Sequence, residues 1–308
     1  MAKYYATVSG LPNLGVEDRK LPFSSASFVE ELQNVLTDKD RRLLDLIRFE
    51  DENRELVHFL ENEDQSEDSL PSFKLIDLEE VKAVLDAMRE RQPLPKHHLP
   101  SYLVDFLRDK MVEKTEDEKD EEENALIDDD EKRTSYPIHL EDVLAEYYYN
   151  HALNCGNKFV EQWARFNLNI KNVFAAAVAR QLNWNPADYV VGDSDIERKL
   201  KSSVAANFGL SEEDISYLPQ LQAILNENDI TRRERMIDVL RWNWLEDRVF
   251  DHPFDVEAIL CYYLQLRIVE RWTDLNEKTG EETFRKIVAN LKKESNESLE
   301  EFKRNQKK

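Results

Sequence analysis

The sequence predicts an all-α protein built from about ten packed helices. Only six Gly and ten Pro interrupt its 308 residues, and the glycine share is well below the roughly 7% of average proteins. Apolar residues recur at spacings of three and four, as on the buried face of a helix. Hydroxyl side chains are followed three positions later by carboxylates, a pattern typical of helix starts. Together these observations favour long helices and leave no segment that reads as a sheet.

Residues 4–8 are expected to be extended, and residues 10–22 to form a loop rich in Pro and Gly. The apolar spacing from Leu43 to Leu60 then predicts an amphipathic helix. Four helix starts are marked by a hydroxyl residue and a carboxylate three positions on. They are Ser27 with Glu30, Ser194 with Glu197, Ser211 with Asp214, and Thr231 with Glu234.

A further helix is predicted over 77–91, because Pro93 and Pro95 follow it and proline stops a helix. Pro100 suits the first turn of a helix that runs to about Glu113. The longest helical pattern spans 137–183 and is expected to break at Asn154-Cys155-Gly156.

The last two helices are predicted over 255–278 and 281–304, with Gly280 as the stop between them. We therefore divide the chain into an N-terminal helical part, 1–112, and a helical remainder, 137–308, that packs with it as one compact unit. Residues 113–136 form an acidic linker, predicted to be disordered. Within it, Glu113 to Arg133 holds 12 acidic and 4 basic residues and offers almost no apolar side chains for a core.

The formal charge of −22 argues against nucleic acid and against direct electrostatic binding to anionic lipids. A basic protein partner fits this charge better. The two cysteines, Cys155 and Cys261, lie far apart, which favours a reduced, cytoplasmic protein. No apolar stretch is long enough to span a bilayer.

No motif for catalysis or for a cofactor stands out. The glycines are isolated, so phosphate-cradling loops are not expected, and neither cysteine has a neighbouring His to activate it. Glu55 and His58 form a single Glu-x-x-His motif, whereas di-iron bundles use two. His97 and His98 lack a carboxylate at ligand spacing. We therefore predict no catalytic, metal or cofactor site.

One predicted helix combines arginine with tryptophan, residue types that are enriched at protein interfaces. These residues are our candidates for binding a partner, although pairing with nearby carboxylates and burial of the tryptophans is the alternative. A second cluster, Tyr147 to Tyr149, cannot face one side of a helix. The partner-binding candidates are Arg232, Arg233, Arg235, Arg241, Trp242 and Trp244.

A short sequence motif recurs at three places in the chain. Arg48-Phe49 and Arg165-Phe166 each precede a turn of polar residues, and Arg267 marks a weaker third copy. Glu50 and Asn53 show a Glu-x-x-Asn pattern that Asn169 and Asn172 repeat as Asn-x-x-Asn. With the closing segment Glu257 to Leu264, Arg267 and Glu270, these motifs resemble the C-type central-stalk component of V/A-type ATPases (ATP synthases) and its counterpart in the eukaryotic V-ATPase, the d-type component. Within that family the chain resembles a divergent bacterial branch encoded alongside V-type ATP synthase subunits.

The resemblance implies a funnel-shaped, all-helical protein with pseudo-threefold internal symmetry. Such a protein has no active site. It sits in the central stalk, on the proteolipid rotor ring at the inner face of the cell membrane, and couples that ring to the D and F axle subunits. The acidic stretch 113–133 departs from the family pattern.

Two other interpretations stay open. An acidic helical adaptor could bind a basic protein through the Arg/Trp helix. A helical metalloenzyme could use Glu55 and His58. The structural interpretation of Asn53, Asn169 and Asn172 is that their amides cap or cross-link helices.

Overall fold

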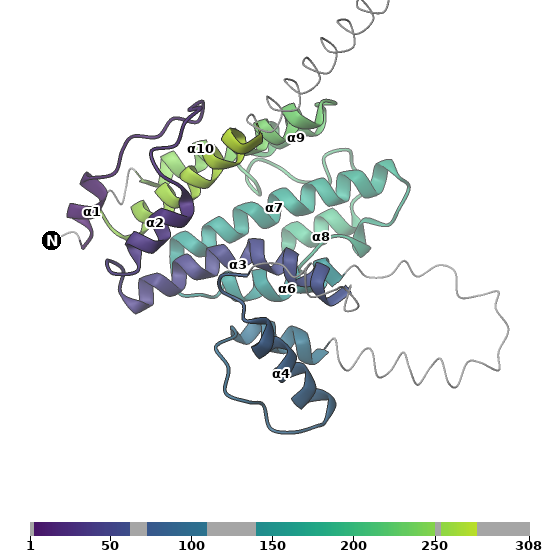
Figure 1. Ribbon diagram of the computed structural model, residues 1–308. Coiled ribbons are helices and arrows are strands. Elements are labelled where there is room, and N and C mark those ends of the chain that lie inside the picture. Colours follow the sequence, from purple (N-terminus) through teal and green to yellow (C-terminus); the bar gives the residue numbers. More distant parts are fainter. Residues whose placement is uncertain (1–2, 62–72, 110–139, 250–253, 276–308) are drawn as a thin grey trace, which may run out of the picture. The chain divides into compact units, whose positions relative to one another are not determined.

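A computed structural model describes residues 3–61, 73–109, 140–249 and 254–275 (Figure 1). Throughout these ranges the secondary structure is helical and no strand occurs, which confirms the predicted all-α class. Within the same ranges, no helix is both long and apolar enough to cross a membrane. The predicted linker 113–136 and the predicted helix 281–304 lie outside the described residues.

The chain divides into two compact units, one formed by 38–229 and the other by 1–37 together with 230–308. The larger unit contains α3 (Asp38–Glu61), α4 (Leu78–Arg89), a helix over 101–109, α6 (Leu140–Ala152), α7 (Lys158–Gln181), η2 (Pro186–Asp188), α8 (Asp195–Ser202) and α9 (Leu218–Leu225). The smaller unit contains α1 (Tyr5–Ser9), α2 (Ser25–Leu32), α10 (Ile230–Val249) and a helix over 256–275. Our predicted packing of 1–112 with 137–308 stays a prediction.

Helix α7 is the centre of the larger unit, since it packs against α6, α8, η2 and α9, while α3 packs against α6 (Figure 1). The predicted break of the long helical pattern is confirmed, because α6 ends at Ala152 and α7 begins at Lys158. Gly156 has φ +77°, a value that glycine adopts without strain. The side chain of Asn157 then caps α7 by accepting a hydrogen bond from Val160 N at 3.0 Å.

The predicted extended start is wrong, because residues 5–9 form the short helix α1. A contact distant in sequence accompanies this: Tyr4 N donates to Phe254 O at 3.1 Å, and the rings of Tyr5 and Phe254 lie 4.7 Å apart. A pattern of five residues is too short to decide between a strand and a helix.

Of the four predicted helix starts, the one at Ser194 is confirmed and the other three differ in the structure. Ser194 caps α8 in a complete capping box with Glu197, as predicted. The N-cap of α2 is Ser24 instead of Ser27, and α10 begins at Ile230, one residue before Thr231. Ser211 and Asp214 close a turn, with Ser211 N donating to the Asp214 carboxylate at 2.9 Å, but no helix starts there. Helix α9 begins only at Leu218, next to Pro219, a residue that favours the first helical turn.

The three consecutive tyrosines divide between the core and its edge. Tyr148 and Tyr149 are buried and Tyr147 is half-buried. The hydroxyl of Tyr148 donates to Leu46 O at 3.2 Å, and that of Tyr149 donates to Glu50 at 2.8 Å. Two of the three side chains therefore tie α6 to α3.

Candidate functional site

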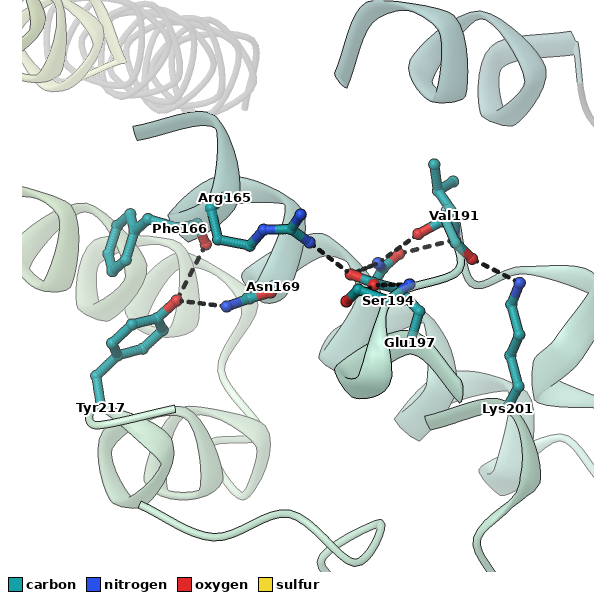
Figure 2. A network of polar contacts seen from close by, with 10 residues as sticks. Arg165, Phe166, Asn169, Val191, Ser194, Glu197, Lys201 and Tyr217 are labelled. Carbon is teal, nitrogen blue, oxygen red and sulfur yellow. Dashed lines mark hydrogen bonds and ion pairs between the residues drawn. The ribbon is translucent and has the colours of Figure 1, made fainter. Parts of the chain in front are cut away.

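A network of polar contacts in the larger unit joins α7 to α8, to the loop before α8 and to the start of α9 (Figure 2). On α7, Arg165, Asn169 and Asn172 follow one another at spacings of four and three, so they share one face of the helix. Asn169 and Asn172 are 4% and 0% exposed. This face of α7 thus presents one guanidinium and two buried amides to the segments that pack on it.

The side-chain amide of Asn172 makes two hydrogen bonds to the main chain of Val191. Its Oδ1 accepts from Val191 N at 2.9 Å, and its Nδ2 donates to Val191 O at 2.8 Å. Both main-chain groups belong to a buried residue, and buried main-chain groups without partners are costly. One side chain therefore satisfies both polar groups of a loop residue and holds that loop against α7.

Glu197 is the centre of the cluster and is only 1% exposed. It accepts from Ser194 N at 2.8 Å and from the Ser194 hydroxyl, which completes the capping box of α8. It also forms an ion pair with Arg165 at 3.1 Å and a longer contact with Asn172 at 3.5 Å. A buried carboxylate requires such partners, because leaving a charge unpaired away from water is strongly unfavourable.

Two lysines in the last turn of α8 connect the helix to neighbouring segments. Lys201 donates to Gly192 O at 2.7 Å (Figure 2), and Lys199 pairs with Asp214 at 2.7 Å. The bond from Lys199, together with those from Ser211, lowers the pKa of Asp214 to about 2. The short helix is therefore tied to the segments before and after it.

Tyr217 connects α9 to the same face of α7. Its hydroxyl accepts from Asn169 Nδ2 at 3.2 Å and donates to Phe166 O at 3.4 Å. Burial raises the pKa of Tyr217 to about 12. Within the part of the chain that the structure describes, Asn169 Oδ1 is buried and has no hydrogen-bond partner.

The Glu-x-x-Asn motif of α3, Glu50 and Asn53, lines a small pocket between α3 and α6. Asn53 accepts from the hydroxyl of Tyr102 at 2.9 Å, and Glu50 accepts from Tyr149. Both residues line the pocket, as does Lys171 of α7. The pocket volume of about 70 Å³ is below the range of roughly 300–1,000 Å³ typical of ligand sites. The structure thus confirms that Asn53, Asn169 and Asn172 cross-link helices and loops.

In the smaller unit, the Arg/Trp candidates lie on α10, which also carries the buried Asp238. Asp238 is 2% exposed and pairs with Arg241 and Arg271, each at 3.1 Å. It also accepts from Trp272 Nε1 at 2.8 Å. Trp242 is buried, so Arg241 and Trp242 have roles inside this unit.

Of the remaining candidates, Arg235 and Trp244 contact side chains of the same unit, and Arg232 and Arg233 differ in exposure. Arg235 pairs with Glu17 at 3.1 Å, and the ring of Trp244 lies 4.8 Å from the guanidinium of Arg248. Arg232 is exposed and Arg233 is half-buried. Partner binding by the Arg/Trp helix stays a prediction.

No group of three or more His, Cys, Asp or Glu side chains in the described ranges is arranged to hold a metal ion. Of the two neighbouring histidines, His98 lies with its ring Nδ1 2.7 Å from the carboxylate of Glu80. The sequence marks Arg165, Asn169, Asn172 and the Ser194 capping box, but it does not reveal that Glu197 joins them. The only sequence signal for that role is the place of Glu197 in the capping box.

The fold and the polar cluster define a class of protein: an all-helical chain whose loops are fastened to long helices by buried side chains. The chain belongs to the family described as "Protein of unknown function (DUF2764)", whose model matches residues 1–295. Neither a curated protein nor a solved structure matches it.

Proposed function

We propose that this protein is a non-catalytic central-stalk component of a V/A-type ATPase. In this proposal it couples the D and F axle subunits to the proteolipid rotor ring at the cytoplasmic face of the membrane. The proposal begins from the resemblance of the motifs around Asn53, Asn169 and Asn172. It requires a chain that transmits torque with little deformation.

The observation that carries the proposal is the use of these motif residues as cross-links. Asn172 is fully buried and holds both main-chain groups of Val191. Asn53 accepts from Tyr102, on the helix over 101–109. Packed interiors have low compressibility, and cross-links of this kind oppose sliding of one segment along another. Stiffness is the property that a mechanical coupler needs.

Glu270, in the last motif of the resemblance, also cross-links two segments. The carboxylate of Glu270 accepts from Ser25 N at 3.0 Å and from the Ser25 hydroxyl at 2.5 Å. In α3, the carboxylate of Glu52 accepts from the main-chain N–H groups of residues 74–76 at 2.9–3.1 Å. A polar side chain on each of three long helices thus holds another segment of its own unit.

The negative net charge of the chain favours binding to an axle with a basic surface. At −22, the chain carries a field that attracts basic protein surfaces and raises their association rate. Binding of this kind weakens with salt, since the Debye length falls from about 10 Å at 0.1 M to about 3 Å at 1 M.

The test is affinity capture of the tagged full-length chain from gently solubilised native membranes, with identification of what is bound. We expect the D and F axle subunits and the proteolipid ring, with the axle subunits lost at high salt. A tag expressed alone is the control. Recovery from the soluble fraction with no ATPase subunit would contradict the coupler, and a basic partner recovered there would favour the adaptor.

A further inference from the structure

The small pocket of the larger unit is lined by charged side chains of both signs. Glu50 and Arg54 line it from α3, Glu141 from α6 and Lys171 from α7. Two carboxylates and two cations make this lining neutral, in a chain whose net charge is −22. We call the space between these side chains the charged pocket.

A buried amide in the charged pocket has a donor left for a ligand. Asn53 lines the pocket and is 7% exposed. Its Oδ1 accepts from the Tyr102 hydroxyl at 2.9 Å, but its Nδ2 donates to no residue that the structure describes. Since a buried donor without a partner is unfavourable, Nδ2 favours a ligand that brings a hydrogen-bond acceptor.

Lys171 supplies further donors to the same pocket. An ammonium has three N–H donors, and the ion pair of Lys171 with Asp142 at 2.6 Å uses one of them. Because Lys171 also lines the pocket, its remaining donors and the amide of Asn53 together suit a carboxylate.

The two carboxylates of the lining determine the rest of the ligand. Glu50 accepts from the Tyr149 hydroxyl at 2.8 Å, and a carboxylate has lone pairs for further donors. Glu141 is 57% exposed and pairs with Arg54 at 3.6 Å. A bare carboxylate is repelled by Glu50 and Glu141, and a bare amine is repelled by Lys171 and Arg54. A ligand that carries both an ammonium and a carboxylate meets an opposite charge at each end.

The volume of the charged pocket limits the ligand to a few atoms. About 70 Å³ is the room that about two water molecules occupy in the liquid, at roughly 30 Å³ each. The walls also include the apolar side chains of Val57, Leu144 and Ala145, against which a methylene or methyl group can pack. The smallest amino acids combine this size with these charges.

We propose that the charged pocket binds a small free amino acid, glycine or alanine. The carboxylate of the ligand accepts from Asn53 Nδ2 and from Lys171, and its ammonium donates to Glu50. This assignment is independent of the proposed function, because it uses only side chains of the larger unit. The bound amino acid joins α3 to α6 and α7 and therefore stabilises their packing.

The experiment is saturation-transfer NMR on the purified full-length chain, with glycine, alanine, acetate and methylammonium titrated at constant ionic strength. We expect saturable binding of glycine or alanine with a Kd of about 1 mM, an affinity that suits a ligand with so few contacts. Acetate and methylammonium each carry one of the two charged groups and should bind at least about tenfold more weakly. The proposal is overturned if neither amino acid binds saturably, or if acetate or methylammonium binds as tightly as the amino acids.

A substitution that fills the pocket shows where the ligand lies. Ala145→Leu occupies the space but leaves every polar group of the lining in place, so binding should fall at least about tenfold. The matched control is Ala83→Leu, since Ala83 is exposed on α4, and it should bind as the wild type does. Equal binding by the two variants means that the ligand lies elsewhere and that the proposal is wrong.

A change of charge gives a readout that does not depend on Ala145→Leu being folded. Lys171→Met keeps an unbranched side chain and removes the ammonium. Glycine should then bind about tenfold more weakly, whereas methylammonium should bind at least as well as before, because a like charge is gone. Unchanged glycine binding, or an equal loss for both ligands, would refute the placement of the carboxylate beside Lys171.

Discussion

Replacing Asn172 with alanine tests how strongly the loop before α8 is held to α7. The amide of Asn172 makes two hydrogen bonds, of 2.8 and 2.9 Å, to the main chain of Val191, and both residues are buried. Alanine leaves one buried N–H and one buried C=O without partners. Each such group costs about 1–3 kcal/mol, so Asn172→Ala should lower the free energy of unfolding by about 2–6 kcal/mol.

Two measurements check this expectation. The first is the midpoint of urea unfolding, which should fall by about 0.7–2 M at a slope of about 3 kcal/mol/M, the upper end of the range for small proteins. The second is hydrogen exchange at the amide of Val191, which should become faster because its acceptor is lost. The exchange measurement reports on the loop itself, even if the two units unfold separately.

Asn150→Ala is the matched control, since Asn150 is an exposed residue of α6 and surface changes of this kind stay within about 0.5 kcal/mol. The reasoning is refuted if Asn172→Ala shifts the midpoint no more than the control and leaves exchange at Val191 unchanged. In that case the loop is held by its apolar contacts and not by the amide.

Two further changes probe the carboxylates around α8. Glu197→Ala removes the partner of Arg165 and half of the Ser194 capping box, and we expect a loss of about 3–5 kcal/mol. Glu197→Gln keeps the shape and should cost less, so equal urea midpoints for the two variants would contradict the role of the charge. Asp214 has a pKa lowered to about 2, below the value of about 3.9 in an unfolded chain. Its ionised form therefore stabilises the fold above about pH 4, and this contribution is lost as the pH falls through about 2. The difference in urea midpoint between wild type and Asp214→Asn should shrink over that interval, and a difference independent of pH would show that ionisation of Asp214 does not stabilise the fold.

Local patterns were sufficient for much of the fold. The break between α6 and α7 was predictable because Gly156 and Asn157 provide a turn and a cap within a few residues. The capping box of Ser194 and Glu197 was predictable for the same reason. The spacing of Arg165, Asn169 and Asn172 placed them on one face of a helix, which is a property of helix geometry alone. What that face contacts was open.

The sequence by itself determined the helical class, most helix positions and the acidic charge, because these depend on residues within one or two turns of each other or on composition. Only the tertiary structure decided that Glu197 is buried beside Arg165 and that Glu270 holds Ser25, 245 residues earlier in the chain. The same holds for the start of α2 at Ser25 and for the helical form of α1. Such contacts join residues far apart in sequence, and no local pattern encodes which distant side chain will remove a polar group from water.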